Sequence, residues 1–182
     1  MRLARFLALA AALGIGIGWV GAAGDEKDTK AALLKLAAAL EKNDKDAAKK
    51  LVDELKKEDL EEVMSLLKAV SKKGIDIGFK EGIETKLGTA GKKAGDMKAN
   101  AEAYEKMAKI VAAVAEVAAL KCTVKAKEGE KDPKKWDEWV GEMKEGAKEL
   151  GEAAKAKDAK KVSAAAKKID GACKSCHGVF RD

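Results

Sequence analysis

The sequence predicts an all-α protein built as a bundle of helices. Pro occurs once and Thr four times among 182 residues, while Ala, Lys and Glu are abundant, a composition that favours helices over sheets. Charged residues make up 37% of the chain and hydrophobic residues 47%, which excludes a disordered chain and a protein with many membrane spans. Only 4% of residues are aromatic, so we expect another group to help fill the interior.

The N-terminus has the pattern of a secretory signal peptide, which we predict for residues 1–23. Arg2 and Arg5 precede an uncharged stretch, residues 6–23, that ends in small residues. The alternative is an uncleaved anchor, because this stretch is nearly long enough to span a bilayer. Its glycines and its small-residue end favour cleavage. We therefore expect a periplasmic or otherwise exported protein that is attached to a membrane only if the segment is retained.

The rest of the chain is predicted to contain a short extension followed by the main bundle. Residues 24–57 form the N-terminal helical extension, and residues 58–182 form the bundle. Residues 74–96 contain six glycines and no long apolar period, but they include several large apolar side chains. Linkers seldom carry such side chains, so this segment is predicted to be an ordered loop.

Amphipathic periodicity predicts the individual helices. Asp132-Pro133 is a strong start signal, because Asp is a good N-cap and Pro suits the first helical position. Asp158 can cap the last helix. The connections are short, so the last three helices should pack antiparallel as neighbours. The predicted helices cover about 27–42, 51–70 with a break near 58–59, 98–124, 133–156 and 159 onward.

The charge pattern argues against nucleic-acid binding. The net charge of +6 comes from 37 basic and 31 acidic residues that are mixed along the chain, as on the solvated faces of amphipathic helices. No basic stripe is interleaved with aromatic residues, as a nucleic-acid surface would require. The surplus of lysine could instead serve as a docking face for an acidic partner.

The chemistry of the chain is concentrated in its last ten residues. Cys173-Lys174-Ser175-Cys176-His177 has the C-x-x-C-H spacing of a c-type haem attachment site. Thiols three residues apart lie on one face of a helix and can bond to both vinyl groups of one porphyrin, and the next residue offers an imidazole to the iron. His177 is the only histidine in the chain. The motif predicts one covalently attached haem c, with Cys173, Cys176 and His177 as its binding residues.

Three other uses of these cysteines are open. A thioredoxin-like dithiol would require a βαβ pattern, which the sequence lacks. A structural zinc site would need four ligands, and only Cys122 could add a soft one. A disulfide between Cys173 and Cys176 would be strained within a helix. Haem attachment is therefore the favoured interpretation.

The C-terminal sequence from Cys173 to Arg181 resembles the C-x-x-C-H-x-x-F-R ending of class II c-type cytochromes, the cytochrome c-prime group. Trp136 and Trp139, early in the preceding helix, add to this similarity, which covers about residues 98–182. The resemblance implies an antiparallel four-helix bundle with haem in its core. It also implies that Cys173 and Cys176 hold the haem and that His177 is the proximal iron ligand.

The sixth iron position decides between two functions. Met97, Met107 and Met143 are expected to lie too far along their helices, whereas Met64 belongs to the predicted first bundle helix, which supplies the distal residue in the family. With Met64 bound, the protein would be an electron carrier that serves redox partner proteins. With Met64 as an ordinary core residue, the iron would be five-coordinate and could bind nitric oxide or carbon monoxide.

Neither of these functions requires enzymatic turnover. No general-base constellation accompanies the haem motif, and the single imidazole is assigned to the iron. The family often forms dimers, so a homodimer is also compatible with the sequence. A thiol or metal-binding protein without haem is a third, less favoured interpretation.

Overall fold

The computed structural model describes residues 26–181, and the predicted signal segment, residues 1–23, lies outside them. The all-α prediction is confirmed for this part of the chain, in which the only strand-like pairing is an isolated bridge between Glu128 and Lys131. No helix in the described range is both long and apolar enough to cross a bilayer. The helices are α1 (Glu26–Glu41), α2 (Lys45–Leu55), α3 (Leu60–Ser65), the 3-10 helix η1 (Val70–Lys72), α4 (Gly82–Ala90), α5 (Met97–Ala118), α6 (Pro133–Lys155) and α7 (Ala159–Phe180).

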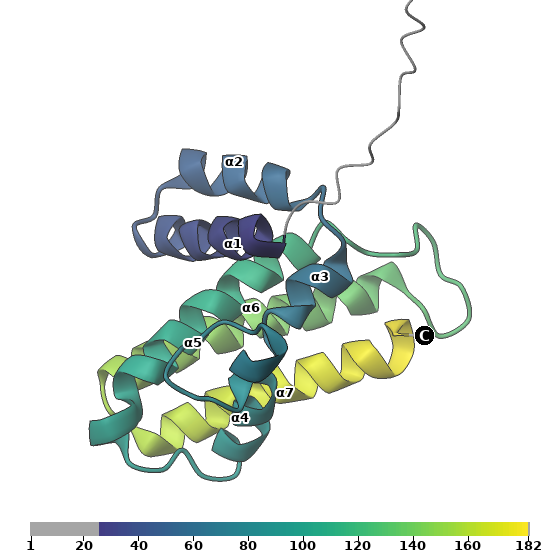
Figure 1. Cartoon of the computed structure of the whole chain (residues 1–182). Coiled ribbons are helices and arrows are strands. Elements are labelled where there is room, and N and C mark those ends of the chain that lie inside the picture. The colour runs from purple at the N-terminus through teal and green to yellow at the C-terminus, as the bar shows by residue number, and fades with distance from the viewer. Residues whose placement is uncertain (1–25, 182) are drawn as a thin grey trace, which may run out of the picture.

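Of the three long helices α5, α6 and α7, the middle helix α6 packs antiparallel against both of the others (Figure 1). At one end of the bundle, Trp136 Nε1 at the start of α6 donates to the carbonyl of Ala118 at the end of α5, at 3.0 Å. Near mid-length, a Cβ atom at Gly146 of α6 would lie 2.7 Å from Ile169 Cγ1 of α7. Glycine and alanine at such positions allow the helices to pack closely without large side chains.

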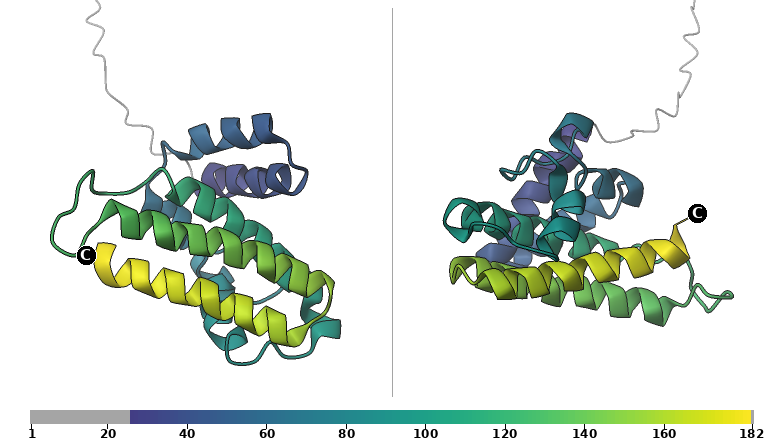
Figure 2. Two further views of the ribbon diagram at one scale, coloured as in Figure 1. Left: turned by 180° about the vertical axis from the view of Figure 1, so that it is seen from behind. Right: turned by 90° about the horizontal axis from the view of Figure 1, so that it is seen from below.

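The short helix α4 packs on α7 (Figure 2). The segment before α4 is fastened to α5 by aromatic packing, since the Phe79 and Tyr104 rings lie 5.2 Å apart. The Tyr104 hydroxyl also donates to the Ala94 carbonyl at 2.6 Å. The three long helices are thus joined at α7 by the short helix α4.

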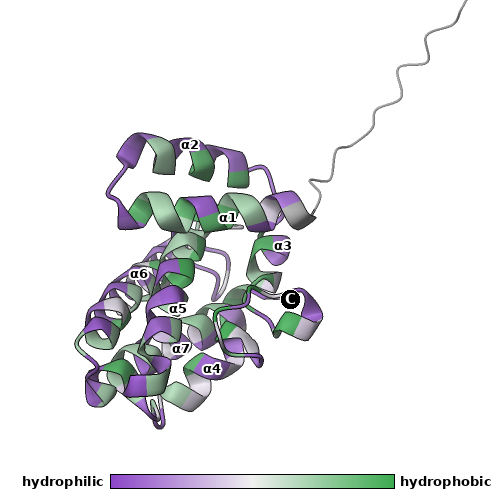
Figure 3. Ribbon diagram, turned by 60° about the vertical axis from the view of Figure 1, so that its left-hand side comes forward, coloured by the Kyte–Doolittle hydropathy of each residue, from purple (hydrophilic) through white to green (hydrophobic). Residues whose placement is uncertain are grey.

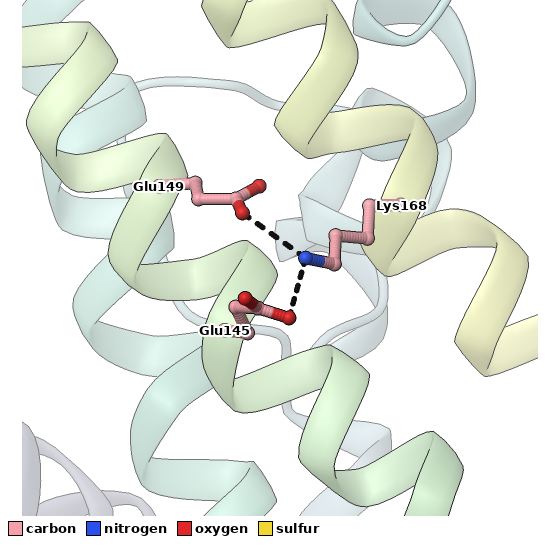
Figure 4. Close-up of polar contacts among 3 residues, drawn as sticks. All are labelled: Glu145, Glu149 and Lys168. Atoms are coloured by element: carbon pink, nitrogen blue, oxygen red, sulfur yellow. Dashed lines mark hydrogen bonds and ion pairs between the residues drawn. The ribbon is translucent and has the colours of Figure 1, made fainter.

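The long helices begin where the sequence predicts. Asp132 accepts a hydrogen bond from Lys134 N at 2.9 Å and precedes Pro133, and Asp158 accepts from the amides of Lys160 and Lys161 at 3.1 Å. Each cap satisfies amides that have no partner within the helix. Outside the bundle, on the α6–α7 surface, Lys168 bridges two carboxylates of α6 (Figure 4).

The first two helices form a hairpin that lies across α5 (Figure 1). The chain reverses at Asn43, whose φ of 54° places it in the left-handed region that Asn tolerates. Leu33 and Leu36, both on α1, are completely buried. Figure 3 shows hydrophobic and hydrophilic residues alternating along the helices, as expected for amphipathic elements that each bury one face.

The predicted break in the second helix is confirmed, because α2 ends at Leu55 and α3 begins at Leu60 after the N-cap Asp59. The prediction of a continuous loop over 74–96 is wrong in its middle, where α4 forms. Ile83, Leu87 and Ala90 are buried at helical spacing and give α4 its apolar face. Glycine disfavours helices locally, but packing on α7 outweighs that preference here.

Candidate functional site

The C-x-x-C-H motif occupies the last two turns of α7. Cys173 and Cys176 are half-buried and pack against the hydrophobic core, whereas His177 is exposed. The helix ends at Phe180, and the Arg181 amide donates to the His177 carbonyl at 3.3 Å. Because three residues make almost one helical turn, both thiols lie on the inner side of α7.

The two thiols are free and neutral at physiological pH. None of the three cysteines of the chain forms a disulfide. Burial raises the pKa of Cys173 to about 12, and nearby Asp170 adds to this effect. Burial also raises the pKa of Cys176 to about 11. A reactive dithiol would instead require a lowered thiol pKa, so this environment disfavours the thioredoxin-like alternative.

Although the His177 residue is exposed, neighbouring protein atoms partly desolvate its imidazole, and Arg181 places a positive charge nearby. Partial burial lowers the pKa of its imidazole, the positive charge of Arg181 lowers it further, and Glu84 opposes both effects. Desolvation and the charge of Arg181 thus favour the neutral imidazole, and only Glu84 favours the protonated one. The neutral imidazole is the form that binds a metal.

An aromatic cluster flanks the motif. Phe180 lies edge-on to Trp136, with ring centroids 5.0 Å apart, and edge-on to Trp139 at 6.1 Å. These two contacts join the end of α7 to the start of α6. An edge-on arrangement is one of the favourable geometries for a pair of aromatic rings. Trp136 and Trp139 therefore lie beside the end of α7 that carries the motif.

Cys122 lies in the loop after α5, at the same end of the bundle. Its thiol donates to the Val124 carbonyl at 3.3 Å, and its charge, when ionised, would raise the pKa of Cys176. The loop between α5 and α6 also lies beside the C-terminus in Figures 1 and 2. Among the described residues, no group of three or more His, Cys, Asp or Glu side chains is arranged to hold a metal ion.

Met64 is half-buried on α3 and packs against the core. Its segment is attached to the motif end of the bundle, because Lys121 Nζ donates to the Glu58 carbonyl and Glu84 N donates to the Leu67 carbonyl. After the predicted break near 58–59, the sequence predicted that this helix continues to about residue 70. The structure instead has the six-residue α3, which ends at Ser65, and the 3-10 helix η1, after which Lys73 adopts a left-handed φ of 69°.

The other methionines are buried core residues: Met97, Met107 and Met143 have exposed fractions of 7%, 0% and 4%. Met64 differs from them in being partly exposed and in lying on a short helix.

Sequence reasoning did not identify Glu84 as part of the site. The residue lies on α4, and its carboxylate acts electrostatically on both Cys173 and His177. The only sequence signal that could have revealed it is the spacing of Ile83, Leu87 and Ala90, which marks α4 as a helix.

The donor set fits a covalently bound haem. Two free thiols lie one turn apart on the core-facing side of α7, an imidazole follows directly, and aromatic side chains flank them.

The comparisons with known proteins agree with this donor set. The family model described as cytochrome c′ matches residues 85–181, which is just over half of the chain. Neither the search of curated proteins nor the search of solved structures gave a match. The matched range includes most of α4 and all of α5, α6 and α7, together with the complete C-x-x-C-H motif. The chain therefore belongs to the cytochrome c′ family, whose members are haem proteins with a four-helix-bundle fold.

Proposed function

We propose that this protein is an exported mono-haem c-type cytochrome that transfers electrons. One haem c is attached covalently through Cys173 and Cys176, and His177 is the proximal iron ligand. The observation that carries this proposal is the inner face of α7, where two free, half-buried thiols precede the single imidazole of the chain in a cytochrome c′-family bundle. When bound, the haem supplies a one-electron couple.

The surrounding residues have separate tasks in this proposal. The core-facing thiols fix the position of the porphyrin, and the fully helical backbone from Ala159 to Phe180 fixes their spacing. Trp136, Trp139 and Phe180 form an apolar wall that limits the access of water. A rigid site of this kind favours electron transfer, because few groups have to move when the charge of the iron changes. We expect no enzymatic turnover.

Met64 is our candidate for the distal ligand. Its thioether is at the motif end of the bundle and is not completely buried in the core, unlike those of Met97, Met107 and Met143. Soft thioether sulfur is a common partner of His in electron-carrying c-type cytochromes. Methionine ligation would give a low-spin iron.

The alternative is a five-coordinate iron that binds nitric oxide or carbon monoxide. The observation in its favour is that Met64 lies on the short α3 between two non-helical segments. Its position relative to α7 is thus set by loop contacts and not by the register of a long helix. If the thioether stays in the core, the distal position is open to a diatomic ligand.

Export and partners belong to the same proposal. Residues 1–23 act as the signal peptide and bring the chain to the compartment in which haem c is attached. Redox proteins with acidic surfaces are the proposed partners, because the chain remains basic after cleavage: without Arg2 and Arg5 it has 35 basic and 31 acidic residues, a net charge of +4. N-terminal sequencing of the protein recovered from the periplasm would distinguish cleavage after Ala23 from a retained membrane anchor.

Optical spectroscopy of the protein made with a cytochrome c maturation system tests the ligation. We expect a low-spin spectrum with a methionine–iron charge-transfer band that is lost in Met64→Leu and kept in Met143→Leu, the matched control. A high-spin spectrum that shifts with carbon monoxide would instead support the gas-binding alternative.

Haem staining of denaturing gels tests the attachment itself. The double variant Cys173→Ala/Cys176→Ala should lose all covalent haem, whereas Cys122→Ala should keep it. Absence of stain in the unaltered protein would overturn the proposed function.

A further inference from the structure

The register between α4 and α7 is defined by close approaches at two glycines. A Cβ atom at Gly91 would lie 3.2 Å from Lys167 Cα, and one at Gly88 would lie 3.7 Å from Asp170 Oδ1. Going from Gly91 back to Gly88 on α4 thus corresponds to going from Lys167 forward to Asp170 on α7. The two helices are therefore antiparallel. Four residues before Gly88, Glu84 is level with Lys174, within the C-x-x-C-H motif.

The first turn of α4 is held firmly in this position. Glu84 N donates to the Leu67 carbonyl at 3.0 Å. Gly82 has a φ of +83°, and any Cβ there would collide with the backbone of Lys68. The base of the Glu84 side chain is thereby fixed beside α7, although its carboxylate remains exposed to water.

The charges around the motif are unequally balanced. Asp170 is paired with Lys174 at 2.6 Å, so much of its negative charge is compensated. Arg181 contributes a positive charge near His177. No hydrogen bond or ion pair to the Glu84 carboxylate occurs among residues 26–181. Glu84 is therefore the uncompensated negative charge facing Cys173 and His177.

We propose that Glu84 lowers the reduction potential of the haem bound by Cys173, Cys176 and His177. This inference rests on the proposed function. The oxidised iron carries one more positive charge than the reduced iron, so a nearby carboxylate stabilises the oxidised state relative to the reduced one. The effect should be moderate and sensitive to salt, because the carboxylate is exposed and mobile ions screen it.

The test is the midpoint potential of the full-length, haem-loaded protein, measured by spectroelectrochemical titration. Glu84→Gln should shift the midpoint to a more positive value, and Glu84→Lys should shift it about twice as far in the same direction. Glu84→Asp keeps the charge and should stay near the unaltered protein. The matched control is Glu81→Gln, which removes the same charge three residues away, where the side chain faces Lys86 at 3.7 Å.

Ionic strength separates this charge effect from a structural effect. The difference between Glu84→Gln and the unaltered protein should shrink at high salt, whereas a shift caused by altered packing should persist. Haem-loaded protein in which Glu84→Gln shifts the midpoint no more than Glu81→Gln does would overturn the inference alone. Unaltered protein that carries no covalent haem would overturn the proposed function and, with it, this inference.

Discussion

The C-terminal region, residues 97–180, is built mainly from three helices of 22 or 23 residues. The N-terminal region, residues 26–90, is instead divided among four α-helices of 6 to 16 residues and one 3-10 helix. The long helices begin at Asp N-caps and bury a continuous apolar stripe. The short helices are held by contacts with distant residues, such as Thr29 with Glu62 and Lys30 with the Gly74 carbonyl.

This difference separates the two requirements of the site. The C-terminal region carries the motif on a rigid helix whose structure is specified locally. The N-terminal region supplies Met64 and Glu84, whose positions depend on loop contacts and on close helix approaches. If the proposed functions hold, haem attachment and its adjustment by Met64 and Glu84 reside in different parts of the fold, and substitutions should change one without the other.

The largest effect on stability is expected in the C-terminal region, at Trp136. Trp136→Ala removes a side chain that is 3% exposed, together with its hydrogen bond to Ala118 and its contact with Phe180. We expect a loss of about 3–5 kcal/mol in the free energy of unfolding. Trp136→Phe keeps most of the apolar contact and should cost clearly less. Urea unfolding followed by circular dichroism measures both, and equal losses would show that the hydrogen bond dominates.

A glycine pair on α4 tests the N-terminal region. Gly82→Ala forces a left-handed residue against the Lys68 backbone and should cost roughly 3 kcal/mol. Gly88→Ala adds a methyl group in ordinary contact with Asp170 at 3.7 Å, so it should be neutral or stabilise the helix by up to about 1 kcal/mol. Thermal melts of the two variants give the comparison. Similar melting temperatures would mean that the first turn of α4 does not approach the Lys68 backbone as described.

The sequence was sufficient to predict what is local. Asp132-Pro133 and Asp158 mark the starts of α6 and α7, and the C-x-x-C-H spacing alone places both thiols on one face. The break before α3 was also visible, because Asp59 is a good N-cap.

Non-local contacts explain what the sequence did not reveal. Helix α4 contains glycines that lower its intrinsic helix propensity, and it is stabilised by packing on α7, a partner about 80 residues away in the chain. Without α4, the role of Glu84 beside the motif could not be recognised. The placement of Met64 on a separate short helix also depends on such contacts.

A smaller effect is expected at the helix caps. Asp158→Ala leaves the amides of Lys160 and Lys161 without their acceptor and should lower the free energy of unfolding by about 1 kcal/mol. Asp158→Asn keeps an acceptor and should be nearly neutral. In the N-terminal region, Asp59 accepts one such bond, from Glu61 N at 3.1 Å, so Asp59→Ala should cost less. Chemical unfolding of the three variants measures this order, and the reverse order would show that α3 depends more on its cap than α7 does.

The smallest effect is expected at Lys168, which contacts Glu145 at 2.6 Å and Glu149 at 3.0 Å on the solvated α6–α7 surface (Figure 4). Lys168→Met should destabilise the protein slightly and less at high salt, because exposed ion pairs are weak and screened. Lys167→Met, at the neighbouring exposed position, is the control.

The pH dependence of this difference gives the sharper result. The hydrogen bond to Lys168 lowers the pKa of Glu145 below its ordinary value of 4.5, so its contribution is present above that value and is lost as the pH falls through the lowered pKa. Hydrogen bonds to Glu145 and then Glu149 raise the pKa of Lys168 above 10.5, so its contribution is lost as the pH rises through the raised pKa. The stability difference between Lys168→Met and the unaltered protein should therefore be largest at neutral pH and disappear on acidification. A difference that persists in acid would mean that the Lys168 side chain acts through packing of its aliphatic stem between α6 and α7.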